Sequence, residues 1–126
     1  MLLQSNFYNI KSFTVEEQNI QAIININPAH GIFKGHFPGQ PVVPGVCMIQ
    51  IIKELTSQHV TTALQLNSAA QVKFLQLLVP EAGQDIQVQI SIKTADEEGT
   101  YSIAASLLQT GKAIMKMNGR FATAMQ

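Results

Sequence analysis

The sequence is poor in cysteine, in charge and in long apolar runs, and each shortage excludes a class of protein. Its 126 residues include one cysteine, Cys47, which rules out an intramolecular disulfide framework and a cysteine-rich zinc site. No apolar run approaches the roughly 18 residues of a membrane span. No positive residue precedes Lys11, so the N-terminal segment does not resemble a signal peptide. We therefore expect a cytoplasmic protein that does not enter the membrane.

Charge is scarce and balanced. Charged residues make up 13% of the chain, and eight Lys and Arg offset eight Asp and Glu. Nucleic-acid binding requires a basic excess, so this balance argues against nucleic acid as a partner. Hydrophobic residues make up 46%, which argues against intrinsic disorder. The length suffices for one core but not for two ordinary domains, so we predict a single domain over residues 1–126.

Apolar residues alternate with polar ones in much of the chain. This period of two is clearest at residues 20–27 and 86–93, which we predict to be half-buried strands. Further strands are predicted at residues 7–15, 64–79, 101–108 and 113–123. Asn118 and Gly119, inside the last of these, suggest a β-bulge.

Residues 46–59 form the best helix candidate. Six of the first seven positions are apolar, the exception being Gln50, so the pattern predicts a buried helix. Lys53 and Glu54 are expected to bring its later turns toward solvent. One buried helix and six strands predict an α+β fold, with the helix lying in a curved antiparallel sheet.

The segment before this helix has a different composition. Residues 28–44 contain four of the five prolines, three of the eight glycines, and both His30 and His36. Such a stiff loop would hold His36, a side chain suited to proton transfer near neutral pH. Free N–H groups at the helix start, from Gly45 onward, suit a carbonyl oxygen that develops charge. A lone loop histidine is more often structural, and the two histidines lack a third ligand for a metal, so no metal site is predicted.

The sequence HFPGQPVVPG at residues 36–45 resembles the HFPGxPxxPG signature of the β-hydroxyacyl-acyl carrier protein dehydratases. IFKG at residues 32–35 and VKF at 72–74 also fit that family, and the resemblance extends over residues 27–124. It implies a hot-dog fold, in which the sheet wraps one long helix, and a dimer with active sites at the subunit interface. It also implies acyl thioester substrates, on an acyl carrier protein or coenzyme A, and no cofactor.

The resemblance assigns roles to individual residues. His36 would remove the proton α to the thioester carbonyl, and the Gly45 N–H would polarise that carbonyl. The backbone carbonyl of Val42 would orient the imidazole. Three aromatic residues could line the acyl chain or equally belong to the core: Phe33, Phe37 and Phe74.

One position departs from the family pattern. The helix carboxylate that the partner subunit supplies in such dehydratases, fourteen residues after the histidine, maps to Gln50. An amide cannot act as a general acid near neutral pH, although it can hydrogen-bond a substrate hydroxyl or a water. Glu54, one turn further on, could substitute, but we favour a solvated helix residue. The protein is then a slower dehydratase in which His36 shuttles the proton, a homologue with altered chemistry, or a heterodimer subunit that offers His36 to a carboxylate on another chain.

The function expected from this resemblance is dehydration of (3R)-hydroxyacyl thioesters in fatty-acid or polyene biosynthesis. The alternatives are a catalytically silent hot-dog subunit or acyl-thioester-binding partner in a heterodimer, and an acyl thioesterase, which the missing carboxylate at Gln50 disfavours. Leu75 and Gln76 stand where the family often has basic residues, which weakens the case for docking an acidic carrier protein. Whether the dimer is a homodimer or a heterodimer stays open.

Overall fold

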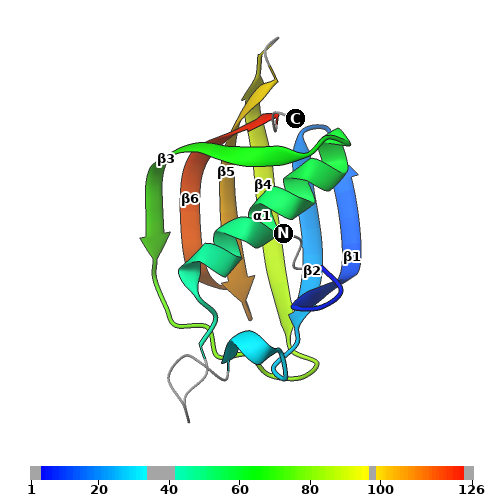
Figure 1. Cartoon of the computed structure of the whole chain (residues 1–126), viewed down its shortest axis with the longest axis vertical. Helices are drawn as coiled ribbons and strands as arrows, with labels where there is room; N and C mark the ends of the chain where they lie inside the picture. The colour runs from blue at the N-terminus through cyan, green and yellow to red at the C-terminus, as the bar shows by residue number, and fades with distance from the viewer. Residues whose placement is uncertain (1–3, 34–41, 97–98, 124–126) are drawn as a thin grey trace.

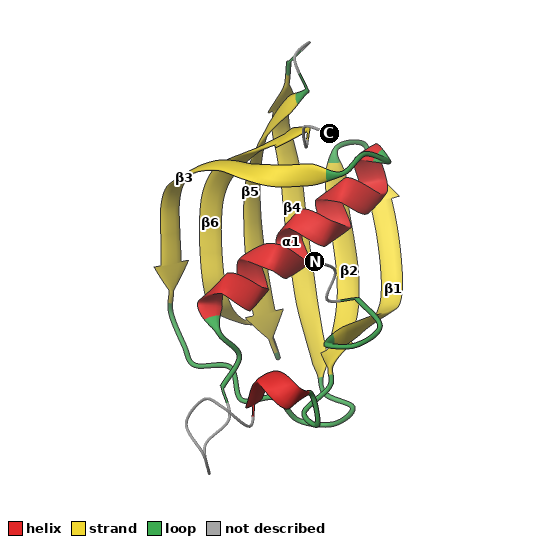
Figure 2. Ribbon diagram, viewed as in Figure 1, coloured by secondary structure: helices red, strands yellow, loops and turns green. Residues whose placement is uncertain are grey.

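The computed structural model describes residues 4–33, 42–96 and 99–123 (Figure 1). In chain order the elements are β1 (Tyr8–Glu16), β2 (Asn19–Ile26), a 3-10 turn (Gly31–Phe33), α1 (Gly45–Val60), β3 (Leu64–Phe74), β4 (Asp85–Ala95), β5 (Thr100–Gln109) and β6 (Lys112–Thr123). The six strands of the described residues form one antiparallel sheet in the order β1-β2-β4-β5-β6-β3. The sheet curves around α1, which runs diagonally across one face (Figure 2), so the predicted α+β architecture is confirmed.

The core lies between α1 and the concave face of the sheet. Along β2 and β4 every second side chain is buried, as the period of two predicted. These side chains meet Ile51, Ile52 and Leu55 of α1, which are fully buried. Each buried aliphatic side chain of this size stabilises the fold by about 1.5–3 kcal/mol relative to exposure. Within the described residues, no helix is both long and apolar enough to cross a membrane.

The helix is less uniformly buried than its composition predicted. Val46 in the first turn is 75% exposed, because α1 turns only one side to the sheet and this residue lies on the other. Glu54, expected to reach solvent, is 6% exposed. The helix ends at Val60, where Thr61 adopts a left-handed conformation (φ 57°) and the Thr62 N–H donates to the Ser57 carbonyl.

Strand β3 differs from the prediction in length and in shape. It ends at Phe74 rather than at residue 79, because the N–H groups of Leu75 and Gln76 both donate to the Ile114 carbonyl and the chain then leaves the ladder. The predicted bulge at residues 118–119 of β6 is wrong. The register shifts fall across from it on β3, between Leu66 and Ser68 and between Ala69 and Gln71. These extra residues bend β3 where it crosses the top of the sheet (Figure 1).

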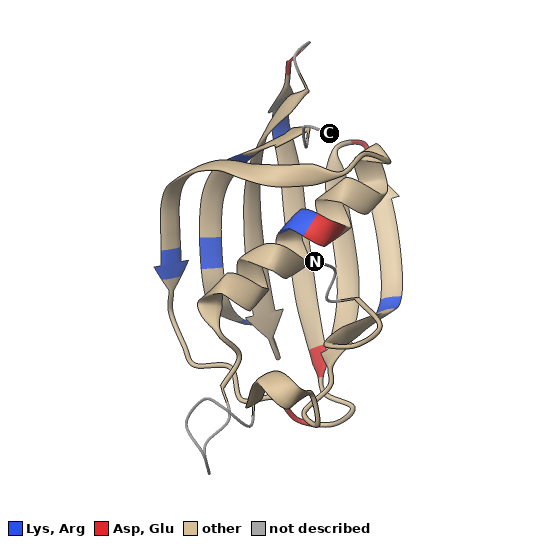
Figure 3. Cartoon of the chain, viewed as in Figure 1, with Lys and Arg blue, Asp and Glu red and all other residues tan. Residues whose placement is uncertain are grey.

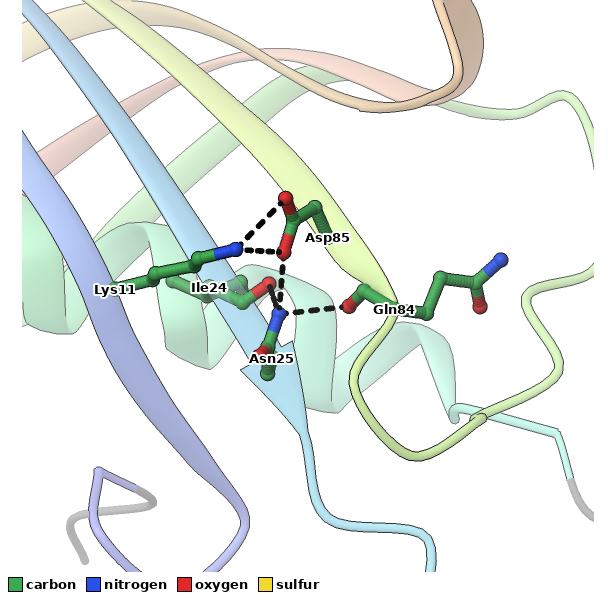
Figure 4. Close-up of polar contacts among 5 residues, drawn as sticks. All are labelled: Lys11, Ile24, Asn25, Gln84 and Asp85. Carbon is green, nitrogen blue, oxygen red and sulfur yellow. Dashed lines mark hydrogen bonds and ion pairs between the residues drawn. The ribbon is translucent and has the colours of Figure 1, made fainter.

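A polar cluster fixes the far end of the sheet, where β1, β2 and β4 meet. The Lys11 ammonium contacts both carboxylate oxygens of Asp85, at 3.1 and 3.2 Å. The Asn25 amide donates to Asp85 Oδ1 and to the Gln84 carbonyl (Figure 4). Hydrogen bonds from Asn25 and Lys11 hold the pKa of Asp85 below its ordinary value. The cluster joins three strands on the exposed side of the sheet and lies away from α1.

Candidate functional site

The helix start is held in place by the segment just before it. The Val43 N–H donates to the Leu78 carbonyl at 2.8 Å, and the Pro44 carbonyl accepts from the N–H groups of Cys47 and Met48. Pro44 is the N-cap residue, in an extended conformation, and its side chain makes no capping hydrogen bond. The first two N–H groups of the helix, those of Gly45 and Val46, have no carbonyl within the helix to donate to, as helix geometry requires. This is the position where the sequence predicted a contact to a thioester carbonyl.

Gly45 lies against the ring of Phe74. A Cβ atom at position 45 would be 2.6 Å from Phe74 Cζ, closer than real Cβ contacts allow. Phe74 itself is 53% exposed, so it is not a core residue. The aromatic ring of β3 therefore covers the start of α1, and only glycine fits beneath it without moving the ring.

The other residues predicted for the site divide into two groups. His36 and Phe37 lie outside the described residues. Val42 is half-buried, directly before the anchored residue Val43. Phe33, the last residue of the 3-10 turn, is buried, and its ring lies 5.5 Å from that of Phe7, so it packs in the core.

His30, the other histidine of the segment before the helix, is half-buried. Its ring meets Phe7 edge-on at 5.3 Å, and its Nδ1 accepts a hydrogen bond from the Ile32 N–H. These contacts give His30 a structural role in shaping the turn.

Gln50 belongs to a hydrogen-bonded cluster centred on Glu54. Gln50 Nε2 donates to Glu54 Oε2 at 2.7 Å, while the Tyr8 hydroxyl and the Gln4 N–H donate to Glu54 Oε1 at 3.0 Å each. The expectation of a solvated Glu54 is therefore wrong. A buried carboxylate is tolerated because these donors replace the water that burial removes. Figure 3 shows the charged residues of α1 side by side near the middle of the helix.

The protonation of two neighbouring groups follows from burial. Burial raises the pKa of the Tyr8 hydroxyl above its ordinary value of 10.0, and the charge and hydrogen bond of Glu54 add to the shift. The hydroxyl therefore stays protonated and donates a hydrogen bond to the carboxylate. Burial also raises the pKa of the Cys47 thiol, so this cysteine is not an activated nucleophile despite its place in the first turn of α1.

A cavity of about 450 Å³ adjoins the cluster, a volume in the range of small-molecule sites. Its walls come from the N-terminal segment, the later turns of α1 and the beginning of β3. The lining is mostly polar: Gln4, Gln50, Lys53, Glu54, Ser57, Gln58, Thr61, Thr62, Ala63 and Leu64. The spacing of Gln50 and Glu54 could have indicated their contact, since residues four apart share a helix face. Nothing in the sequence indicated the contribution of Tyr8, 46 residues away.

Large apolar side chains are exposed around the start of α1 and the end of β3. This apolar cluster consists of Val46, Phe74, Leu75, Leu77 and Val79, which are 75%, 53%, 50%, 79% and 48% exposed. It adjoins an edge of the sheet, because β3 pairs only with β6 among the described strands. Grouped apolar exposure beside an open strand edge is typical of a protein–protein interface.

Comparisons with known proteins agree on a family. A family model for ApeI-like proteins, described as "ApeI dehydratase", matches residues 12–116. The 3-hydroxyacyl-[acyl-carrier-protein] dehydratase FabZ of Levilactobacillus brevis is 28% identical over 97 residues, covering 71% of this chain and 65% of the relative. The chain thus spans less than two thirds of the length of the curated dehydratases it matches.

Solved structures agree on the fold. The dehydratase heterocomplex ApeI:P from Xenorhabdus doucetiae is similar with a TM-score of 0.70 and 21% identity, over 90% of this chain and 96% of that one. A hypothetical thioesterase protein with coenzyme A from Streptococcus pneumoniae is similar with a TM-score of 0.63 and 8% identity, over 99% of this chain and 94% of that one. These likenesses confirm the hot-dog fold.

Proposed function

The chain belongs to the ApeI-like dehydratase family, and from this premise we propose that it dehydrates (3R)-hydroxyacyl thioesters. The observation that carries the proposal is the family match over residues 12–116, which includes the complete HFPGQPVVPG motif. The acyl group would be carried by an acyl carrier protein, with coenzyme A as the alternative carrier. The route would be fatty-acid or polyene biosynthesis.

In the proposed reaction, the imidazole of His36 takes the proton from the carbon α to the thioester carbonyl. The carbon–carbon double bond forms as the β-hydroxyl leaves, and the imidazolium returns its proton to that hydroxyl to give water. The Gly45 N–H, at the positive end of α1, stabilises the negative charge that develops on the carbonyl oxygen. Anchoring of Val43 to Leu78 supports this role, because it fixes the helix start relative to the sheet. The Val42 carbonyl is proposed to orient the imidazole.

Gln50 is proposed to reach across the dimer interface and hold the substrate hydroxyl in the site of the other subunit's histidine, without protonating that hydroxyl. Glu54 is a poor substitute acid, since its oxygens already accept hydrogen bonds from Gln4, Tyr8 and Gln50. This arrangement supports a mechanism in which one histidine performs both proton transfers, and it disfavours a thioesterase that needs a free carboxylate to activate water.

We also propose that the chain works in a dimer with a second hot-dog subunit. The apolar cluster beside the β3 edge supports this, because five large side chains are exposed there. A related fold occurs in a dehydratase heterocomplex, which favours a different subunit as the partner. Leu77→Lys, which puts a charge at the most exposed position, should weaken the association, while Val15→Lys, at an exposed apolar position on β1 at the opposite edge of the sheet, is the matched control. Light scattering on the chain alone and mixed with candidate subunits measures this, and a monomer in every mixture contradicts the proposal.

Hydration of a 2-enoyl thioester tests the activity, with the wild type assayed alone and with candidate hot-dog subunits. His36→Ala should lower the rate at least about 100-fold, the usual contribution of a general base. His59→Gln, at the other end of α1, is the matched histidine control. Release of free thiol, assayed in parallel, would reveal a thioesterase. Absence of hydration in every mixture overturns the dehydratase proposal.

A further inference from the structure

The side chain of Gln50 can present either of two chemically opposite groups to a ligand. Its amide carries two donor hydrogens on nitrogen and lone pairs on oxygen. Glu54 determines which end of the amide faces the ligand. Its carboxylate oxygen only accepts hydrogen bonds, so it pairs with the nitrogen end of the Gln50 amide. The 2.7 Å contact from Gln50 Nε2 to Glu54 Oε2 shows that choice. The amide oxygen is consequently directed away from Glu54.

The carboxylate that makes this choice is itself fixed from another part of the chain. Tyr8 in β1 and the backbone N–H of Gln4 both donate to Oε1, and Gln50 donates to Oε2. The Tyr8 side chain is 1% exposed and Glu54 is 6% exposed, so neither can readily rotate. Glu54 is therefore a fixed group against which the half-buried Gln50 is oriented.

Resting on the proposed function, we propose that Glu54 is a positioning residue that makes Gln50 a hydrogen-bond acceptor for the substrate hydroxyl in the adjoining cavity. A hydroxyl that gives its hydrogen to Gln50 Oε1 keeps its oxygen lone pairs available. Those lone pairs receive the proton that turns the hydroxyl into leaving water. In the opposite orientation the amide N–H would donate to a lone pair of the substrate hydroxyl oxygen and would compete with the proton that must bind there. Gln50, Lys53 and Glu54 all line this cavity, so a substrate bound there would lie beside the hydrogen bond between Gln50 and Glu54.

The pair also determines which substitution could restore a carboxylate at position 50. Gln50→Glu alone places two carboxylates at the hydrogen-bond distance now held by the amide and Glu54, so repulsion should displace both. The exchange Gln50→Glu with Glu54→Gln keeps one amide and one carboxylate in contact. We expect the exchange variant to retain the fold and the single variant to lose stability.

The test uses the full chain, with its partner subunit if activity requires one. Glu54→Leu should lower kcat for hydration roughly 10- to 100-fold with little change in KM, as expected for a misplaced group. In a Gln50→Leu background, the same substitution should have no further effect on kcat. Independent losses at the two positions would mean a merely structural role and would overturn the proposal. Glu54→Gln retains one oxygen acceptor and should recover part of the rate, and Glu16→Leu, an exposed carboxylate on β1, is the control.

A second measurement separates this inference from the proposed activity. The Gln50 side-chain amide gives an NMR signal that Glu54→Leu, or Glu54→Gln if the first variant does not fold, should move strongly and Glu16→Leu should not. (3R)-Hydroxybutyryl-pantetheine should bind at least about tenfold more tightly than butyryl-pantetheine, and Glu54→Leu should abolish that preference. Equal binding of the two thioesters, or no binding of either, overturns the inference. If the protein binds the hydroxyacyl thioester more tightly but shows no hydration activity, the positioning role of Glu54 is retained and the dehydratase proposal is rejected.

Discussion

The hydroxyl of Tyr8 donates a 3.0 Å hydrogen bond to Oε1 of Glu54, across 46 residues of sequence. This contact joins the first residue of β1 to the middle of α1. It links the edge of the sheet farthest from β3 to the helix that carries Gln50. Stability of the fold and orientation of the candidate site therefore depend on the same buried hydrogen bond.

Tyr8→Phe removes one donor from the buried Glu54 carboxylate and leaves the aromatic packing intact. We expect a loss of about 1.5–3 kcal/mol in the free energy of unfolding, the usual contribution of a hydrogen bond to a charged group. Urea denaturation measures it. Tyr101→Phe, at a half-buried position, is the control and should change stability by less. Equal stability of Tyr8→Phe and the wild type would show that water replaces the lost hydroxyl.

The raised pKa of Tyr8 predicts a delayed ionisation. With Tyr101→Phe, Tyr8 becomes the only tyrosine, since the chain has two. Its absorbance change should appear above the ordinary value of 10.0 and coincide with unfolding. A raised folded pKa contributes stability that is complete below pH 10.0 and falls as the pH rises above it. Ionisation near pH 10.0 in a chain that is still folded, as judged by circular dichroism, would contradict the buried hydrogen bond.

Gly45→Ala tests the contact between the helix start and the ring of Phe74. In a helix interior alanine is more stabilising than glycine by about 1 kcal/mol, and a smaller gain is expected at the first helical position. Here the new Cβ would lie 2.6 Å from Phe74 Cζ, so we expect the gain to be cancelled or reversed. In a Phe74→Ala background the same change should stabilise the protein. Thermal unfolding of the four proteins gives the coupling, and equal effects in both backgrounds would show that the exposed ring moves away without cost.

Asp85 predicts a pH dependence at the opposite end of the sheet. Its pKa is lowered by hydrogen bonds from Asn25 and Lys11, so its stabilising contribution is present above the ordinary value of 3.8. That contribution is lost as the pH falls below this value toward the lowered folded pKa. The stability difference between the wild type and Asp85→Asn should therefore shrink on acidification. Asp96→Asn is the comparison, and a difference that does not vary with pH would contradict the cluster in Figure 4.

Most of the fold could be predicted from the sequence because its strands alternate cleanly. Period-two burial at β2 and β4 requires only local information, and the predicted ranges agree with the observed strands. The end of β3 could not be predicted in this way. Leu75, Leu77 and Val79 continue the apolar pattern after the ladder has ended, and their exposure depends on where the chain leaves β6.

The candidate site was only partly predictable for a similar reason. Gln50 was noticeable as a polar residue among apolar neighbours, but burial of Glu54 depends on Gln4 and Tyr8, which are distant in sequence. A charged residue in a helix is usually solvated, so composition favoured the wrong environment for Glu54. His36 and Phe37 lie outside the described residues, so their predicted roles stay predictions.

The strand order also has a consequence for how the chain folds. β4, β5 and β6 are joined by short turns and pair with their neighbours in sequence, whereas β2 must find β4, and β3 must find β6, across long intervening segments. Closing long loops slows folding, so the three-stranded meander should form first and serve as the template for the outer strands. Pulse-labelled hydrogen exchange should then protect the amides of β5 before those of β3, which pairs only with the distant β6 among the described strands. Simultaneous protection of both strands would indicate that the sheet forms in a single step.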